Sequence, residues 1–197
     1  MTADQTARAL SLGFACSWWH PWEPTWSYTP AGLLRALSDR DHLTVTSIPA
    51  QRPLAGKAAM RLAYRYSETA WQHGRLNRWL TQRSILRDAV RSRTEVVLAM
   101  SMTEPVLPVP TFFYQDMGFS VVRAYNDRSG HRSSNLGPVS ASRLQVLVDE
   151  ESDRYRACTG VFTMSHWFAR WLTEVVGVSP EKVHVVGGGL NALPVSR

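Results

Sequence analysis

Several polar side chains in this sequence follow short apolar runs, directly or within the next loop, and two of them could act on a bound ligand. Asp116 follows the run Thr111–Gln115, and its carboxylate could accept a hydrogen bond from a hydroxyl group. His20 could hydrogen-bond a hydroxyl or a phosphate group. We take Asp116 and His20 as the candidate catalytic residues. Each also has an ordinary interpretation, because Asp116 could cap a following helix and His20 could be a loop histidine.

Short runs rich in β-branched and aromatic residues predict the strands that would position these side chains. The segment Ser17–Tyr28 contains prolines and crowded aromatic residues, which predict a loop after the first strand. A turn is expected at Pro49–Gly56 and a proline-rich loop at Thr103–Pro110. The predicted strands are Ala9–Ser17, His42–Ile48, Glu95–Met100, Thr111–Gln115, Gly160–Thr163 and Val183–Val186.

Helices are expected between the strands in the first half of the chain. Thr29 followed by Pro30 predicts a capped helix that ends near Ser38. The stretch Lys57–Arg93 has no proline and is helical in pattern, and Gly74 should kink it or divide it into two helices.

The pattern continues in the second half. Met117–Asn126 is ambiguous, and the polar segment Asp127–Pro138 predicts a mobile loop. A long amphipathic helix is expected over Ser140–Cys158, and a helix over His166–Val176 is capped by Ser165 and ended by Gly177. The apolar side of the long helix is formed by Leu144, Leu147, Val148 and Tyr155.

This alternation of strand and helix predicts an α/β fold with a doubly wound, mostly parallel, Rossmann-like sheet flanked by helices. We expect a single domain over 1–186, followed by a hinge and tail over 187–197. Ligands of such sheets bind beyond the carboxyl ends of the strands. The loops expected to form a site are those after Ser17, Ile48, Met100 and Thr163, and the one at Asp116.

The composition narrows the classes of partner. The chain has 22 Lys+Arg against 16 Asp+Glu, a net charge of +6, which favours anionic partners. Cys16 and Cys158 are the two cysteines, and no signal peptide or membrane-spanning run is visible. We therefore expect reduced thiols and a cytoplasmic location, with a possible peripheral position at the inner face of the membrane.

Three common enzyme motifs are missing. The first predicted strand is followed by S-W-W-H-P-W rather than by G-x-G-x-x-G, which argues against a nicotinamide or flavin dehydrogenase. Neither G-x-x-x-x-G-K-[ST] nor G-x-S-x-G occurs, which argues against a P-loop enzyme and against a hydrolase of the α/β type.

The segment Val161–Asn191 resembles the last βαβ unit of the N-terminal domain in family 4 retaining glycosyltransferases of the GT-B fold. In that family a strand ends in a serine that caps a helix, a glycine ends the helix, and a P-E-K-V type turn leads to a last strand and a linker. The linker here reads V-V-G-G-G-L-N, with Gly187 and Gly188 where proline and asparagine are common. The resemblance extends more weakly to Tyr114–Asp116 and Trp22–Tyr28.

The resemblance implies the acceptor-binding half of an enzyme that transfers a sugar from a nucleotide-sugar donor to a hydroxyl acceptor. The family's donor domain, with its E-x7-E pair, would follow the hinge and is absent from the sequence. Glu174 and Glu181 are one residue too close for that pair. We therefore expect no transferase activity from this chain alone. No cofactor or metal ion is implied, because the nucleotide sugar is the co-substrate.

The resemblance also suggests residues that would contact the acceptor or the donor. The rings of Trp18 and Trp19 could stack on a sugar or lie buried under a lid, and Glu23 could orient a hydroxyl group or be solvated. Ser165 could bind an anion at a helix N-terminus or serve only as the cap. The candidate binding residues are Ser17, Trp18, Trp19, Glu23, Gln115, Ser165 and Asn191, of which Asn191 could simply shape the hinge.

The stretch 57–93 is strongly basic and contains several large apolar side chains. Cationic, aromatic helices can lie on an anionic membrane surface. A solvated helix with an apolar stripe facing the core is the simpler alternative. No nucleic-acid recognition motif is present, so nucleic acid is not an expected partner. The basic residues are Lys57, Arg61, Arg65, Arg75, Arg78, Arg83, Arg87, Arg91 and Arg93.

Two further functions stay open. The chain could be a stand-alone Rossmann-type binding module for an anionic partner, either a phosphorylated ligand or a membrane surface. It could also be a complete small enzyme that acts on a phosphorylated metabolite. The direction of the tail after Gly187 would distinguish these proteins from a half-enzyme.

Overall fold

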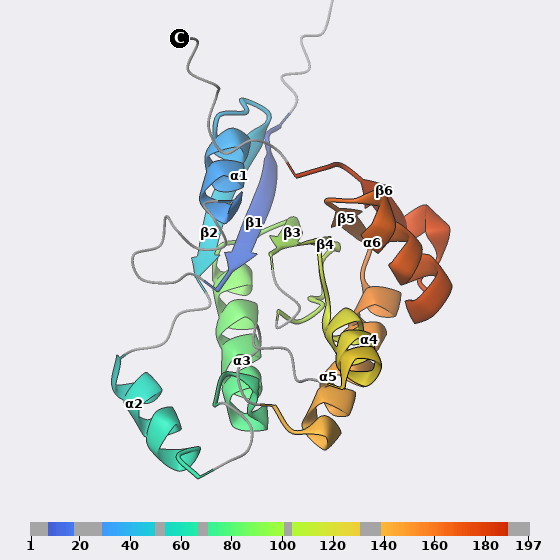
Figure 1. The fold of residues 1–197 in the computed structure, drawn as a ribbon. Coiled ribbons are helices and arrows are strands. Elements are labelled where there is room, and N and C mark those ends of the chain that lie inside the picture. Colours follow the sequence, from blue (N-terminus) through green and yellow to red (C-terminus); the bar gives the residue numbers. More distant parts are fainter. Residues whose placement is uncertain are drawn as a thin grey trace, which may run out of the picture.

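The computed structural model describes residues 8–17, 29–49, 54–66, 71–100, 104–130 and 139–188. In this part of the chain, six strands form one parallel sheet in the order β2-β1-β3-β4-β5-β6 (Figure 1). The predicted doubly wound, Rossmann-like α/β fold is confirmed. The strands are β1 (Leu10–Cys16), β2 (Leu43–Pro49), β3 (Val96–Ala99), β4 (Thr111–Gln115), β5 (Gly160–Thr163) and β6 (Val183–Val185).

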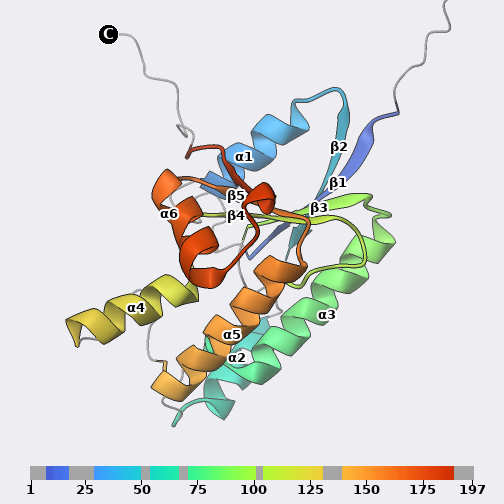
Figure 2. The same ribbon diagram turned by 90° about the vertical axis from the view of Figure 1, so that its right-hand side faces the viewer.

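The central strands are apolar because helices cover the sheet on both sides. One face packs against α1 (Thr29–Ser38) through a cluster that includes Phe14 and Tyr114. The other face carries the larger core, with Phe113 and Tyr155 fully or almost fully enclosed. Figure 2 shows α1 on one side of the sheet and the long helices α3 and α5 on the other.

Close approach between neighbouring elements explains Gly13 in the middle of β1. A Cβ atom at this position would lie 2.7 Å from Ile48 Cδ1 and 2.9 Å from Thr94 Cγ2. Both distances are shorter than normal carbon contacts, so only glycine fits without moving these side chains.

The basic stretch forms two α-helices, as Gly74 predicted. The first, α2, spans Leu54–Ala63 and so begins inside the segment that we expected to be a turn. A short 3-10 turn, Trp71–His73, leads to Gly74, which is the N-cap of α3 (Arg75–Arg91).

The ambiguous segment after β4 is helical. The helix α4 spans Phe119–Ser129, so it includes the first three residues of the predicted loop Asp127–Pro138. That prediction was wrong for these residues because the helix is ended by Gly130, whose φ of 67° places it in the left-handed region. Polar composition alone did not distinguish the last helical turn from a loop.

The two helices predicted in the second half of the chain are present, and Ser165 and Gly177 cap the second of them as predicted. The helix α5 spans Ala141–Ala157, and the Ser140 side chain accepts a hydrogen bond from Arg143 N at 3.3 Å. The helix α6 (His166–Trp171) continues as a π-helical turn, Leu172–Val176, which Gly177 ends with a φ of 76°. No helix of the described residues is long and apolar enough to cross a membrane.

Candidate functional site

The topology reverses direction at the pair β1 and β3, and this is where a doubly wound sheet binds its ligands. From β1 the chain moves to β2 at one edge and then crosses back to β3 on the other side of β1. The carboxyl ends of β1 and β3 therefore border the topological switch point.

A hydroxyl and a buried carboxyl group meet at this switch point. Ser17, the residue after β1, donates from Oγ to Glu104 Oε1 at 3.4 Å. Glu104 follows β3 and is completely buried. Burial raises the pKa of the neighbouring Cys16 thiol, and the Glu104 carboxyl group raises it further. Cys16 therefore stays a thiol at neutral pH and is not a nucleophile.

The carboxyl end of β4 places Gln115 and Asp116 at the same edge of the sheet. Gln115 is almost fully buried, and its Nε2 group has no hydrogen-bond acceptor among the described residues. Asp116 is exposed. Burial raises the pKa values of Tyr114 and Tyr155, and the charge of Asp116 adds to both shifts. Because a buried N–H group without a partner is costly, Gln115 is the side chain here with capacity left for a ligand oxygen.

Asp116 does not cap the following helix, so that interpretation was wrong. The N-cap of α4 is Gly118, and the first free N–H groups of the helix are taken by Glu151 on α5. The Glu151 carboxyl group accepts from Phe119 N at 2.7 Å and from Ser120 N at 3.0 Å. A carboxyl group is well suited to the positive end of a helix. The Asp116 carboxylate is left exposed to solvent beside the site.

Glu151 is a buried acidic residue that sequence reasoning missed. Burial raises its pKa, and the hydrogen bonds from Ser120 and Phe119 lower it in part. A signal was available, since Glu151 continues the spacing of Leu144, Leu147 and Tyr155 and so lies on the core-facing stripe of α5. Glu104 was also missed, and its position just before Pro105 in a predicted loop gave no sign of its burial.

Ser165 is the N-cap of α6 rather than a free ligand group. Its Oγ accepts a hydrogen bond from Phe168 N at 3.1 Å, and its carbonyl oxygen accepts one from Thr163 Oγ1 at 3.3 Å. Phe168 of this helix is fully buried in the same core cluster as Val161 of β5. The cap therefore has a structural role in holding α6 against β5.

The remaining predicted site residues lie outside the part of the chain that the structure describes. They are Trp18, Trp19, His20, Glu23 and Asn191. The described part of the linker ends at Gly188. Before it, the Gly187 carbonyl oxygen accepts a hydrogen bond from the Tyr114 hydroxyl at 3.0 Å. Across the ranges that the structure covers, no three His, Cys, Asp or Glu side chains group together as metal ligands.

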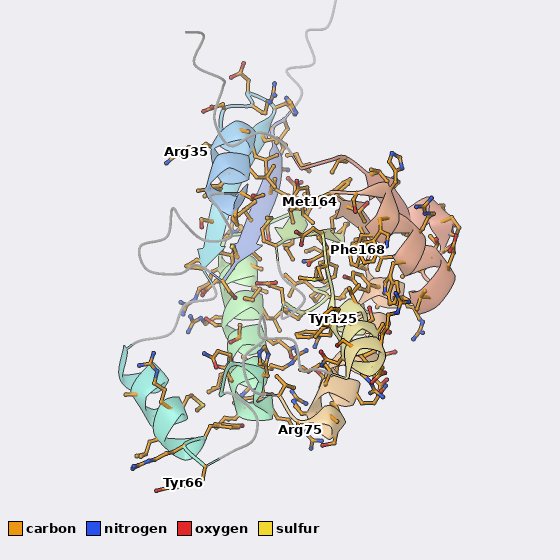
Figure 3. The ribbon with its side chains drawn as sticks, in the orientation of Figure 1. Arg35, Tyr66, Arg75, Tyr125, Met164 and Phe168 are labelled. Carbon is orange, nitrogen blue, oxygen red and sulfur yellow. The ribbon has the colours of Figure 1, made fainter. Side chains whose placement is uncertain are left out.

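The helix α3 does not bury the apolar face that the simpler interpretation of the basic stretch predicted. Its buried residues are Arg78, Thr81, Ile85 and Ala89. The expected core-facing apolar stripe was wrong apart from Ile85, because the other large apolar side chains of α3 face solvent. Figure 3 shows Arg75 at the start of α3 and Tyr66 near the outer end of α2, both well away from the sheet. The exposed apolar residues of α3 are Leu76, Trp79, Leu80, Leu86 and Val90.

The fold and this edge define the chain as an α/β domain of Rossmann-like architecture, with polar residues gathered at the switch point of its sheet. The sequence matches no protein-family model. No curated protein is similar enough to count as a relative.

Proposed function

We propose that this chain is the acceptor-binding domain of a retaining glycosyltransferase, which transfers a sugar from a nucleotide-sugar donor to a hydroxyl group. The observation that carries the proposal is the unit β5–α6–β6. It has the features on which the resemblance depends: the Ser165 cap, the end at Gly177, and a turn over Pro180–Lys182 before the last strand. A second support is the polar edge at the switch point.

In this proposal the carboxyl edge holds and orients the acceptor. Gln115 Nε2 would donate to an acceptor oxygen, and the Asp116 carboxylate would accept from an acceptor hydroxyl group. Ser17 would be held in place by its hydrogen bond to Glu104. In a retaining transfer the hydroxyl group attacks from the side on which the diphosphate leaves, so the main task of these residues is positioning.

Sugar binding at this edge can be measured without knowing the natural acceptor. Saturation-transfer NMR with a panel of methyl hexosides and inositol should detect binding to the wild-type chain. We expect Gln115→Leu and Asp116→Asn each to weaken it by roughly tenfold, the effect of one lost hydrogen bond to a charged or buried group. The matched control is Asp127→Asn, which removes an exposed carboxylate from α4 that pairs with Arg123 at 2.8 Å. The proposal would be contradicted if the three variants bound the sugars with equal affinity, or if the wild-type chain did not bind them.

The exposed face of α3 favours a second function, attachment to an anionic membrane surface. Residues at helical spacing from Leu76 to Val90 place a tryptophan and several aliphatic side chains on one face. Arg83 lies on the same face, with its guanidinium carbon 4.5 Å from the centre of the Trp79 ring. Such a face can insert its apolar side chains at the lipid boundary while its arginines bind the headgroups.

The preceding helix α2 and the residues just after it also expose apolar side chains. Leu62 is 72% exposed and Tyr66, just beyond the helix, is 90% exposed. The Arg65 guanidinium carbon is 5.4 Å from the centre of the Tyr66 ring. Both helices of the basic stretch therefore expose apolar side chains close to cationic ones.

Co-sedimentation with vesicles tests this function. We expect binding to vesicles of phosphatidylglycerol but not of phosphatidylcholine, and weaker binding at high salt because exposed charges are screened. Trp79→Ala should weaken binding several-fold. The control is Trp167→Ala on α6, since the two tryptophans are almost equally exposed at 49% and 50%. Failure to sediment with anionic vesicles at low salt would exclude a membrane role for this face.

A further inference from the structure

Three arginines from two helices gather around one carboxylate on the sheet face opposite α1. Glu150 of α5 has an oxygen 2.6 Å from Arg78 Nη2 of α3. The same oxygen is 3.5 Å from Arg154 Nη2, and the other oxygen is 3.6 Å from Arg143 Nη1. We call this set of three arginines the arginine cluster. It lies beside Glu151, whose carboxyl group contacts the start of α4 at the carboxyl edge of the sheet.

Two arginines of the cluster, Arg78 and Arg143, are buried but not fully hydrogen-bonded. The side chain of Arg78 is 4% exposed and that of Arg143 is 10% exposed. Arg143 Nε donates to the His73 carbonyl oxygen at 2.8 Å. Among the described residues, Arg78 Nη1 and both Nη atoms of Arg143 have no hydrogen-bond acceptor. Buried guanidinium groups normally satisfy their fixed fork of donors, so this geometry leaves room for more acceptor oxygens.

The positive charges of the cluster also act on one another. Burial lowers the pKa of Arg78 to about 10, and the charges of Arg154 and Arg143 contribute to the decrease. Glu150 and Glu151 raise the same pKa in part. Burial also lowers the pKa of Arg154, and Glu150, Glu104 and Glu151 raise it in part. Glu150 lies at contact distance from all three guanidinium groups.

Glu150 is the member of the group that can most easily leave. Its side chain is 35% exposed, compared with 4% for Arg78. A partly exposed carboxylate in contact with buried arginines occupies a place that an external anion could take.

We propose that the arginine cluster binds a phosphate group, which takes the place of the Glu150 carboxylate. A phosphate group has the charge and the number of acceptor oxygens to engage the unpaired N–H groups of Arg78 and Arg143 and the guanidinium of Arg154 at the same time. This inference does not depend on the glycosyltransferase proposal. It specifies a phosphate-bearing small molecule, and the membrane face of α3 is a separate surface, because Arg78 points to the opposite side of that helix.

The test compares Glu150→Gln with the wild-type chain, using inorganic phosphate as the probe and chloride at equal ionic strength as the reference. Removing the competing carboxylate should tighten phosphate binding about tenfold in isothermal titration, since one charge-assisted contact no longer has to be broken. Glu150→Gln should unfold at a lower temperature in chloride. Phosphate at about ten times its Kd should raise that temperature by roughly 3–6 °C.

Two further variants make the result specific. Asp153→Asn changes the charge of the same helix by the same amount, at a carboxylate paired with exposed Arg156 at 3.2 Å, and should leave phosphate binding unchanged. Arg143→Gln in the Glu150→Gln background should remove the added affinity. Circular dichroism confirms that each variant is folded before it is titrated.

The outcomes separate the alternatives. A loss of stability in Glu150→Gln that phosphate does not rescue would show a network that only joins the helices and would overturn the proposal. Equal tightening in Asp153→Asn would show a general charge effect and would overturn it as well. A final arm uses phosphatidic acid vesicles. If Glu150→Gln tightens vesicle binding but not binding of free phosphate, the ligand is a lipid headgroup and the small-molecule proposal is wrong.

Discussion

The start of α4 depends on a close contact that a single methyl group would disturb. Gly118 has an extended backbone, with φ −136° and ψ 175°, so alanine would cause no backbone strain there. A Cβ atom on Gly118 would, however, lie 2.6 Å from Glu151 Oε1 and 2.8 Å from Oε2. We therefore predict that Gly118→Ala moves the Glu151 carboxyl group away from the first N–H groups of the helix.

The size of the effect follows from the bonds that would be lost. Glu151 accepts two backbone N–H groups, and such bonds contribute about 1–2 kcal/mol each. The alanine also restricts the unfolded chain, which offsets about 0.4–1 kcal/mol of the loss. We expect the free energy of unfolding to fall by about 1–3 kcal/mol. For a chain of this size the melting temperature should fall by roughly 2–12 °C.

Urea unfolding followed by circular dichroism measures this change, and two comparisons make it decisive. Gly56→Ala in α2 is the matched control, because a Cβ there has no atom within 4 Å, and it should stabilise the chain by about 0.5 kcal/mol. Gly118→Ala should cost almost nothing when added to Glu151→Ala, because the displaced carboxyl group is then absent. If Gly118→Ala costs as much with Glu151→Ala as without it, the contact with Glu151 is not the cause.

Three other outcomes are expected. Cys16 and Cys158 are free and buried, and burial raises the pKa of both thiols. Neither should therefore react with a thiol reagent at about pH 8 until the chain is unfolded. Rapid labelling of the native chain would contradict this prediction. Burial also raises the pKa of Glu151, so its stabilisation is present below the pKa of the unfolded chain and is lost as the pH rises through the folded pKa. The free energy of unfolding of the wild-type chain, relative to Glu151→Gln, should thus decrease in urea titrations as the pH rises above about 4.5, the ordinary pKa of a glutamate. Gly13→Ala should lower the free energy of unfolding by about 1–3 kcal/mol through its contacts with Ile48 and Thr94, as measured by the same titrations.

The strands and helix caps were predictable because their signals are local. Apolar runs bounded by breakers located the six strands, and Ser165 and Gly177 were visible as the caps of their helix. The orientation of α3 was not predictable from its own residues. Hydrophobicity favoured the face with Trp79, but the helix buries Arg78 because Glu150 on another helix pairs with it. That partner is distant in sequence, so the pattern of α3 alone carried no information about it.

The candidate site, too, could be predicted only in part from the sequence. Gln115 and Asp116 were located because residues after a parallel strand must lie at the carboxyl edge. Their surroundings depend on Glu104 and Glu151, which come from a loop and from a different helix. Only Glu151 had a usable signal, its place in the buried stripe of α5.

The position of β1 between β2 and β3 has a consequence for how the chain folds as it is made. One neighbour, β2, follows soon after β1, but Ser11 of β1 is hydrogen-bonded to Glu95, just before β3, across 84 residues of sequence. At about 5–20 residues per second, the ribosome completes β3 several seconds or more after β1. Throughout that interval one edge of an apolar strand has no partner. Closing the long loop to β3 should therefore be a slow step in folding, and the nascent chain is most prone to aggregate before it occurs.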